Sequence, residues 1–378
     1  MEPTAFDVAI VGGGPAGAAT ALSLRAYAPS LAVVVIEASR YATARIGETL
    51  PPPARTLLEH LGVWQAFRAQ HHRESYGTTA VWGTARPLDN DFIYMPASVG
   101  WHLDRAAFDA LLASQAEARG ATLMLDTRLR DAERTDDEWR LTLSSGSPIS
   151  ARFVVDATGG VAAFARRCGA RFVDADRLVG ISRLFDGDGG DPRVLVEAFA
   201  DGWWYTAGLP DGRRITVCMT DADLARRLRL TEAERWHEKL AAMPAVGAML
   251  RESKPCGPVV VHSSESRRLD PVAGDDWLAV GDAASRFDPL SSQGIIKALR
   301  SGVFASYAIG DWLTRGDEAG LRRYHRFVLA EFKSYEETRA KYYREEQRWP
   351  TSEFWRRRHG LDGQHTKSVP PAVAGGSD

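Results

Sequence analysis

The chain of 378 residues is long enough to bury a sizeable core, and its composition, 44% hydrophobic and 25% charged, is that of an ordinary globular protein. A formal net charge of -2 provides no basic excess to neutralise phosphates, so nucleic acid is not expected as a partner. The cysteines, Cys168, Cys218 and Cys256, are far apart and odd in number, which predicts neither a disulfide framework nor a metal site. No stretch is apolar for long enough to predict a membrane span, and a cytoplasmic location is expected.

The first expected elements are a strand, a glycine-rich turn and a helix. Residues 6–11 are apolar apart from Asp7, and three of them are β-branched, which is typical of a buried parallel strand. Residues 18–24 are small and apolar, as in a buried helix. The turn between them has the G-x-G-x-x-G spacing, which lets a pyrophosphate approach the backbone at a helix N-terminus. The residues predicted to bind this group are Gly12, Gly14, Pro15, Ala16 and Gly17.

A second strand is expected at residues 31–36, and it is followed by Glu37 and Ala38. Glu37 follows Gly12 by 25 residues, close to the spacing of a carboxylate that accepts hydrogen bonds from ribose hydroxyls. Strand, turn, helix, strand and acid together predict a dinucleotide-binding unit. They do not distinguish NAD from FAD.

Residues 277–299 resemble the second flavin motif of FAD enzymes. They consist of a short apolar strand, then Gly281 and Asp282, then a proline-led turn that opens a helix. The resemblance implies that Asp282 binds the ribityl chain and that the helix start offers N–H groups to the flavin ring, where they stabilise negative charge. The residues implied at this end of FAD are Pro289, Ser292, Gln293, Gly294 and Ile295.

Three further segments resemble FAD-binding segments of the same enzymes. One is the Ala-Thr-Gly stretch after a strand expected at residues 152–155, and another is a helix start that Asp104 is expected to cap. The third is a Gly-Glu-Thr segment, similar to one shared by flavin-dependent halogenases and their hydroxylase relatives. The resemblance implies cofactor contacts for Asp156, Gly159, Arg105, Arg45, Gly47 and Glu48.

These motifs predict an α/β fold of the glutathione-reductase-like type, with a Rossmann-like FAD-binding domain, an inserted antiparallel-sheet substrate domain and a C-terminal helical region. The FAD-binding domain is expected to be discontinuous, with residues 1–75, 98–170 and 264–330. Residues 76–97 and 171–263 are expected to form the substrate sheet, with strands at 77–82, 193–199, 203–209, 214–220 and 258–263 and a hairpin turn at 210–213. Helices are predicted at 231–250 and 318–348; the helical region is expected at 331–366 and a loose tail at 367–378.

The chain resembles the flavin-dependent monooxygenase and halogenase superfamily, but two halogenase features are missing. The resemblance implies that a halogenase would carry a lysine shortly after the Gly-Glu-Thr segment, whereas the first lysine of this chain is Lys239. The halogenase Trp-x-Trp-x-Ile-Pro signature is also absent, and the nearest stretch is residues 203–210. Halogenation is therefore disfavoured.

Several stretches resemble a subgroup, the flavoprotein maturases, whose members hydroxylate a tryptophan of a partner polypeptide during tryptophylquinone biogenesis. The resemblance implies an FAD-dependent monooxygenase that hydroxylates an aromatic substrate through a flavin C4a-hydroperoxide, with O2 as co-substrate. No second dinucleotide fingerprint is found, so NAD(P)H or a separate flavin reductase is expected to supply electrons. The resembling stretches are residues 202–205, 209–212, 219–221, 287–294 and 354–358.

The sequence identifies no firm catalytic acid or base. The candidates are His72 and His102, as bases, and Trp203 and Tyr205, as an aromatic wall on one face of a strand; the alternatives are hydrogen-bonded histidines and core aromatics. Residues 356–358 are three arginines, either a solvated charge run or a surface for an acidic partner. Other functions stay open: a small-molecule hydroxylase of a biosynthetic cluster, an FAD-dependent dehydrogenase or reductase, or a flavin-stabilised assembly factor.

Overall fold

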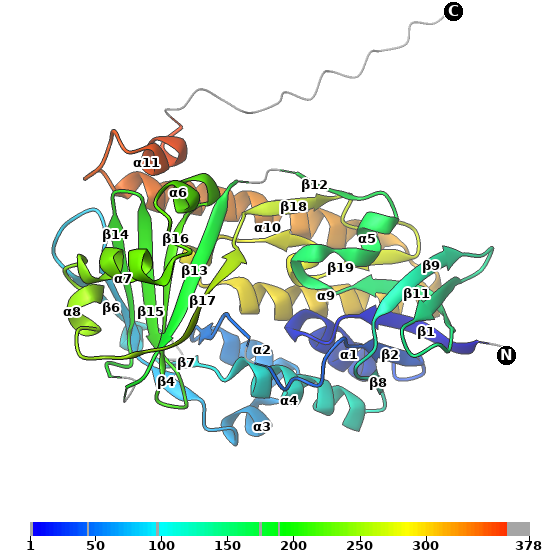
Figure 1. The fold of residues 1–378 in the computed structure, drawn as a ribbon. Coiled ribbons are helices and arrows are strands. Elements are labelled where there is room, and N and C mark those ends of the chain that lie inside the picture. Colours follow the sequence, from blue (N-terminus) through cyan, green and yellow to red (C-terminus); the bar gives the residue numbers. More distant parts are fainter. Residues whose placement is uncertain (1–2, 44, 96–97, 174–175, 188–189, 361–378) are drawn as a thin grey trace, which may run out of the picture.

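The computed structural model describes residues 3–43, 45–95, 98–173, 176–187 and 190–360. Two large sheets lie at opposite ends of the molecule, and long helices connect them (Figure 1). The tail expected at 367–378 lies outside the described residues, as does the end of the helical region expected to reach 366. None of the helices in the described part of the chain has the length and apolar character needed to cross a bilayer.

The first sheet has the order β8-β2-β1-β11-β10-β9, and β19 pairs with β11. Its centre is parallel: Val8 of β1 lies opposite Val33 of β2 on one side and Phe153 of β11 on the other. A hairpin of β9 and β10 continues the sheet in antiparallel fashion. The strands are β1 (Thr4–Val11), β2 (Val33–Ile36), β8 (Thr122–Met124), β9 (Leu129–Arg134), β10 (Trp139–Leu143), β11 (Ile149–Asp156) and β19 (Trp277–Ala279).

Helix α1 (Pro15–Tyr27) follows β1 and packs against α4 (Arg105–Ala118) and α9 (Gly294–Arg315). The contact with α9 is very close, because a Cβ on Gly302 would lie 2.5 Å from the carbonyl oxygen of Ala16. Gly302 therefore brings the two helices that follow the two predicted flavin motifs directly together. The strand–turn–helix–strand unit expected at the start of the chain is confirmed.

The second sheet has the order β17-β13-β16-β15-β14-β5-β6. All the strands predicted for the substrate sheet pair within it, and the predicted turn joins β15 to β16. One pair differs from the expected antiparallel arrangement, because β5 runs parallel to β14. The strands are β5 (Gly77–Val81), β6 (Leu88–Asp91), β13 (Leu178–Phe185), β14 (Val194–Phe199), β15 (Gly202–Gly208), β16 (Arg214–Asp221) and β17 (Pro255–Ser263).

Two three-stranded sheets lie between the large ones. The sheet of β12, β18 and β20 includes the start of the range expected for the substrate sheet, while the sheet of β3, β7 and β4 joins the Gly-Glu-Thr segment to residues 73–75 and 100–102. Their strands are β3 (Thr49–Leu50), β4 (Arg73–Ser75), β7 (Gly100–His102), β12 (Arg171–Val173), β18 (Arg267–Asp270) and β20 (Ser285–Arg286).

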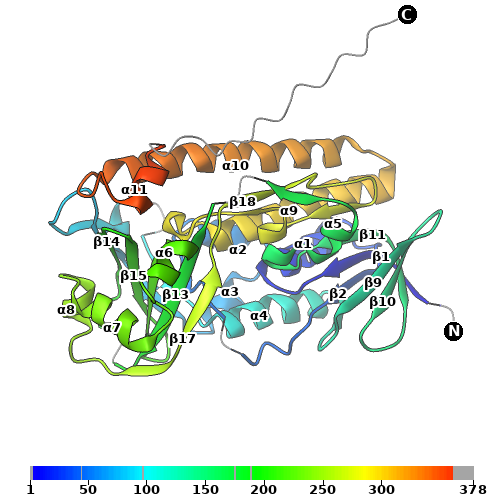
Figure 2. The ribbon, with the colours of Figure 1, turned by 45° about the horizontal axis from the view of Figure 1, so that its top comes forward.

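Helix α10 (Ala319–Glu345) runs along the length of the molecule beside α9, and α11 lies beyond its end on the second sheet (Figure 2). The single helix expected at 231–250 is instead α7 and α8. Pro244 lies between them, and proline disfavours a helical conformation of the preceding residue. The shorter helices are α2 (Ala54–His60), α3 (Trp64–Arg68), α5 (Ala163–Arg167), α6 (Ala222–Arg227), α7 (Ala233–Ala241), α8 (Val246–Met249) and α11 (Glu353–Arg358), with 3-10 turns η1 (Phe92–Tyr94), η2 (Gly159–Val161), η3 (Gly281–Ala283) and η4 (Pro289–Ser291).

Candidate functional site

The glycine-rich turn after β1 combines close packing with open space. Gly12 has φ 110°, and a Cβ there would lie 2.2 Å from the carbonyl oxygen of Ala157. A Cβ on Gly17 would lie 1.9 Å from the carbonyl oxygen of Gly12, so both positions require glycine for the fold itself. At Gly14 no atom lies within 4 Å of the added Cβ. Gly14, the N-cap of α1, therefore faces a space that a ligand can enter.

Glu37, at the end of β2, holds this turn in place. Its Oε2 accepts a 2.8 Å hydrogen bond from the Gly13 backbone N–H, while Oε1 accepts from the Ser39 hydroxyl and from Arg45. Arg45 also forms a 2.8 Å ion pair with the buried Asp109. Among the described residues Oε2 accepts only this one hydrogen bond, so it can accept another from a ribose hydroxyl. Arg45 contacts the Glu37 carboxylate and not the glycine-rich turn itself.

Asp156, at the end of β11, is an internal residue. Its carboxylate accepts hydrogen bonds from the backbone N–H groups of Thr158, Phe164 and Ala165, and the side chain is completely buried. This carboxylate is therefore taken up by the loop and is not free to contact a cofactor. Its role is to fix the shape of the loop. In that loop Gly159 has φ 65° and open space around its Cβ position.

The second motif places Asp282 beside the turn. Its side chain is 42% exposed, and its Oδ1 lies 2.8 Å from the ammonium of Lys297, which is almost completely buried on α9. Partial desolvation alone would raise the pKa of Asp282, but the charges of Lys297 and Arg286 hold that pKa below its usual range. Gly281 donates its N–H to Ser301, so α9 fixes both residues of the Gly-Asp pair.

Helix α9 presents its N-terminus to the same region. Asp288 accepts from the Leu290 N–H and starts the η4 turn, Ser292 has φ 50°, and α9 begins at Gly294 with no side chain capping it. No atom lies within 4 Å of a Cβ built on Gly294. The first N–H groups of α9 are therefore left for a ligand. Ile295, the second residue of α9, is buried.

Arg105 makes its hydrogen bonds and its ion pair to neighbouring parts of the protein. Its guanidinium donates to the carbonyl oxygens of Ile46 and Gly47 and pairs with Asp109, and Asp104 caps the helix as predicted. Gly47 has φ 90°, and a Cβ there would lie 2.7 Å from that guanidinium. Arg105 thus shapes the Gly-Glu-Thr segment.

The phenol of Tyr205 connects this segment to the second sheet. It donates a 2.5 Å hydrogen bond to Oε1 of Glu48, and it lies 2.6 Å from the Thr49 hydroxyl. Because the phenol proton goes to Glu48, the Thr49 hydroxyl donates to the phenol oxygen. Burial and the charge of Glu48 raise the pKa of Tyr205 well above its usual range, so the phenol remains a donor.

The two candidate histidines do not have the properties of catalytic bases. Burial lowers the pKa of each to about 4. His72 accepts a hydrogen bond from the Asp104 N–H, and His102 is completely buried with its Nε2 3.0 Å from the Pro192 carbonyl oxygen. Both are neutral structural residues at neutral pH.

Trp203 belongs to the core and not to an exposed wall. Its side chain is buried among residues of the second sheet, α10 and α11, and its Nε1 donates to the hydroxyl of Tyr343. Arg357 and Arg358 pair with Asp221, which fixes α11 on the second sheet. Among the described residues, no three metal-ligating side chains gather in one place.

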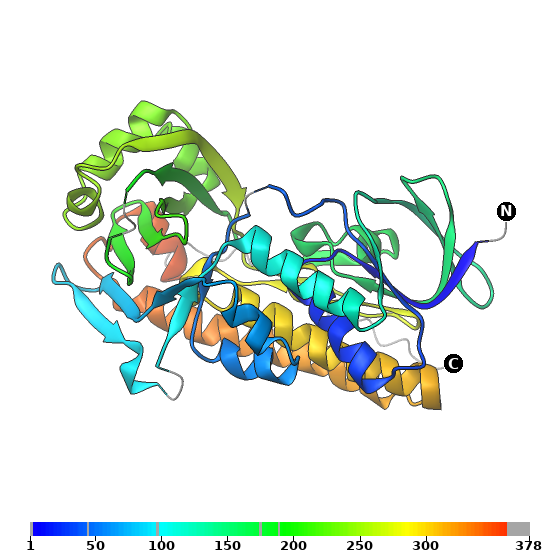
Figure 3. The same ribbon diagram turned by 90° about the horizontal axis from the view of Figure 1, so that it is seen from below.

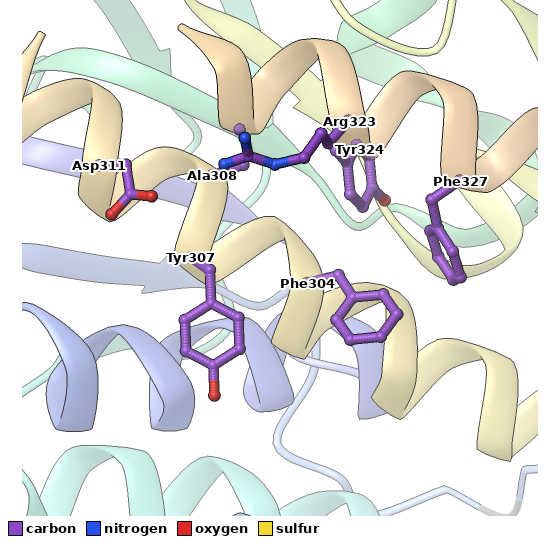
Figure 4. Close-up of a pocket in the computed structure, with 8 residues that line it drawn as sticks. Phe304, Tyr307, Ala308, Asp311, Arg323, Tyr324 and Phe327 are labelled. Atoms are coloured by element: carbon purple, nitrogen blue, oxygen red, sulfur yellow. The ribbon is translucent and has the colours of Figure 1, made fainter. Parts of the chain in front are cut away.

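A hollow of the described part of the molecule lies elsewhere. It has a volume of about 220 Å³ and lies between α9 and α10, where Phe304, Tyr307, Tyr324 and Phe327 line it (Figure 4). Phe304 is ten residues, or about 15 Å, along α9 from its N-terminus. No residue of the glycine turn or of the η4 turn lines this hollow.

The residues around the two motifs fit FAD. A Cβ added at Gly14, Gly159 or Gly294 would meet no atom within 4 Å, and neither α1 nor α9 has a side-chain cap. Several residues of this site carry no sequence signal, since only the fold reveals the roles of Lys297, Asp288 and Asp109.

Comparison with known proteins identifies the family of this chain. The FAD binding domain family matches residues 5–333. LodB of Marinomonas mediterranea, which is named as an FAD-dependent oxidoreductase, is 30% identical and covers 95% of this chain and 99% of its own.

Two solved structures extend the comparison. The peptidyl tryptophan dihydroxylase QhpG, described as essential for tryptophylquinone cofactor biogenesis, is 27% identical with a TM-score of 0.76 and covers 97% of this chain and 81% of its own. The flavin-dependent halogenase CmlS is also 27% identical, with a TM-score of 0.84, and the match covers 95% of this chain and 68% of CmlS. The chain therefore belongs to the FAD binding domain family, within the flavin monooxygenase and halogenase superfamily, and it is an FAD-dependent oxidoreductase.

Proposed function

We propose that this protein is a monooxygenase that uses O2 to hydroxylate an aromatic ring, and that the ring is a tryptophan of a partner polypeptide. The observation that carries the proposal is the contact of Tyr205 with Glu48 and Thr49. It places a carboxylate where the proposed flavin site meets the sheet proposed to hold the substrate. The similarity to QhpG over 97% of the chain supports a peptidyl tryptophan as the substrate.

Bound FAD would supply the redox chemistry that activates O2, and the chain supplies position and charge. The N-terminus of α1 and Gly14 would hold the pyrophosphate, and Asp282 the ribityl chain. The N–H groups at the start of α9 would stabilise negative charge on the ring. The remaining proposed contacts are those of Gly12, Pro15, Ala16, Gly17, Glu37, Ala38, Arg45, Gly47, Arg105, Gly281, Pro289, Ser292, Gln293 and Ile295.

Glu48 is the group proposed to act on the substrate. When oxygen adds to an aromatic carbon, that carbon must lose its proton for the ring to become aromatic again, and a nearby carboxylate can accept it. Tyr205 is the positioning residue, because its hydrogen bond orients Glu48 Oε1, while the Gly47 N–H holds Oε2. His72 and His102 take no part in this step.

Halogenation is not supported, although halogenases are among the relatives. No lysine precedes Lys239, and Lys239 itself pairs with Asp201 on the second sheet. Lys297 is buried and pairs with Asp282. We therefore propose oxygen insertion, with electrons from NAD(P)H or from a separate flavin reductase.

The test is a single turnover in isotopically labelled O2. Reduced holoprotein is mixed with O2 and a tryptophan-containing peptide, and the product is analysed by mass spectrometry. We expect one labelled oxygen atom in the indole ring for each hydroxylation. Reoxidation of the flavin with no label in any aromatic product would contradict the proposal and favour a reductase, and a halogenated product in the presence of halide would favour a halogenase.

A further inference from the structure

Lys297 is a buried lysine at a position where the fold favours an apolar residue. It lies near the N-terminal end of α9, its side chain is only 1% exposed, and the surrounding Ile295, Ala298 and Leu299 are buried as well. Burying an ammonium is costly, and the positive end of the helix dipole disfavours a cation here. The stability of the fold therefore does not explain this lysine.

The backbone of Lys297 is held in a fixed place. Helix α9, in yellow, packs against α1, in dark blue, and against α10, in orange (Figure 3). The Lys297 N–H donates a 2.9 Å hydrogen bond to the carbonyl oxygen of Gln293 at the start of the helix. From this base the side chain extends to η3 and β20, where its contacts lie.

The ammonium of Lys297 contacts three groups of the protein. It lies 2.8 Å from Oδ1 of Asp282, it donates to the carbonyl oxygen of Ser285, and it is 4.8 Å from the centre of the Phe287 ring. An ammonium has three N–H donors, and these contacts account for them. Lys297 can therefore act on a bound ligand through Asp282 and not by direct contact.

Asp282 has one oxygen held and one available. Lys297 holds Oδ1, whereas Nε of Arg286 is 3.8 Å from Oδ2, which is too long for a hydrogen bond. Among the described residues no hydrogen bond goes to Oδ2, and the Asp282 side chain is 42% exposed. Oδ2 can therefore accept a hydrogen bond from a ligand hydroxyl.

Four cationic side chains lie close enough to act on the Asp282 carboxylate. Within the described part of the chain, only the one on α9 forms a hydrogen bond to it. The other carboxylate that this ammonium influences is Glu331 of α10, which pairs with Arg300. The four cations are Lys297 on α9, Arg286 on β20, Arg105 on α4 and Arg267 on β18.

We propose that Lys297 is a positioning residue for FAD, whose ammonium orients the Asp282 carboxylate so that Oδ2 accepts hydrogen bonds from the ribityl hydroxyls. This inference rests on the contact proposed above between Asp282 and the ribityl chain, and it does not depend on hydroxylation. Hydrogen bonds to an ionised carboxylate are about twice as strong as neutral ones, so loss of the ammonium weakens FAD binding without removing a direct contact.

The experiment is a double-mutant cycle on the full-length chain freed of its flavin, in which fluorescence measures the Kd for FAD. We expect Asp282→Asn and Lys297→Met each to raise this Kd about tenfold. The double variant should bind FAD no more weakly than Asp282→Asn alone, because Lys297 acts through the carboxylate. ADP, which has the adenosine and the pyrophosphate of FAD but no ribityl chain, should bind to all of these proteins with the same Kd.

The pH dependence of FAD binding is a second measurement, which a merely structural role of Lys297 would leave unchanged. Without this ammonium the pKa of Asp282 rises, because desolvation remains while the strongest attraction to the carboxylate is lost. The affinity of Lys297→Met for FAD should therefore fall further between about pH 8 and about pH 5, unlike that of the wild type or of the double variant.

Lys239→Met is the matched control, because Lys239 also pairs with an aspartate, Asp201, at 3.0 Å, but on the second sheet. It should leave the Kd for FAD unchanged. Thermal unfolding checks that each variant folds, and Lys297→Met should fold, since an apolar side chain suits this buried position.

Three results would overturn the role of Lys297: normal FAD affinity of Lys297→Met, additive losses in the double variant, or an equal loss of ADP affinity. If Asp282→Asn itself binds FAD normally, the proposed ribityl contact fails and the role of Lys297 fails with it. The labelled-O2 experiment is independent of this one, so a failure of hydroxylation with the expected binding pattern would leave the role of Lys297 intact.

Discussion

Tyr343 on α10 donates a 2.7 Å hydrogen bond to Oδ2 of Asp288, the residue that starts the η4 turn ahead of α9. The Asp288 N–H donates to Tyr335, also on α10, and Trp203 of β15 donates to the Tyr343 hydroxyl. Helix α10 therefore links the proposed flavin-binding turn to the second sheet. Since all these groups are buried, the link depends on each hydrogen bond being made.

We predict that Tyr343→Phe lowers the free energy of unfolding by about 1–3 kcal/mol, because it leaves the Asp288 carboxylate and the Trp203 indole each short of a partner. FAD affinity should fall as well, since the turn that Asp288 starts loses a support. Chemical denaturation and a fluorescence titration with FAD measure the two effects. Tyr342→Phe is the control, because Tyr342 lies on the same helix but is 49% exposed. If Tyr343→Phe and Tyr342→Phe lower stability and FAD affinity equally, the proposed support of the η4 turn by Tyr343 is refuted.

Two substitutions in the glycine-rich turn should distinguish an effect on FAD binding from an effect on folding. Gly14→Ala should fold normally, because no atom lies within 4 Å of the new Cβ, yet FAD affinity should fall at least about tenfold, because that Cβ occupies the space proposed for the pyrophosphate. Gly12→Ala should instead yield little folded protein, given the carbonyl oxygen 2.2 Å away and the positive φ. The measurements are the flavin content and the thermal unfolding of both variants. Full flavin loading of folded Gly14→Ala would contradict the proposed pyrophosphate site at Gly14.

Local patterns predicted the parts of the fold that depend on neighbouring residues. The first strand and helix, the hairpin turn and the Asp104 cap all follow from residues close together in the chain. Strand β13 was missed because Gly180 and Arg183 interrupt its apolar pattern. The structure explains the glycine, since a Cβ there would lie 2.9 Å from the Met219 sulfur.

Long-range contacts could not be predicted in this way. Tyr205 and Glu48 are 157 residues apart, and no pattern in either segment indicates that they meet. The roles of histidines depend on burial, which the stretch around His72 does not reveal. Lys297 looks like an ordinary helix lysine until the fold places its ammonium against Asp282.

Acid should loosen the attachment of α11. The hydrogen bond from Arg357 lowers the pKa of Asp223 from 3.8 to about 2, so its contribution to stability is complete above about pH 4 and is lost as the pH falls through about 2. Asp223 is partly exposed, so this contribution is on the order of 1 kcal/mol. As the pH is lowered from about 4 to about 2, the free energy of unfolding of the wild type should fall. It should fall less in Arg357→Gln, which lacks this hydrogen bond. If the free energy of unfolding depends on pH in the same way in both proteins, the Arg357–Asp223 pair does not cause the acid sensitivity.

Finally, the hydrogen bond between Tyr205 and Glu48 predicts a selective loss of rate. In Tyr205→Phe the Glu48 carboxylate keeps the Gly47 N–H but loses its orienting phenol, so we expect kcat to fall about tenfold while FAD affinity and the KM for an indole substrate change little. Tyr76→Phe provides the control, because Tyr76 also donates to a glutamate, Glu74, at 2.7 Å but is exposed. Since the Tyr205 phenol stays protonated, the wild-type pH–rate profile should show no ionisation that Tyr205→Phe removes. A fall in FAD affinity that matches the fall in kcat would show that the phenol serves cofactor binding and not the placement of Glu48.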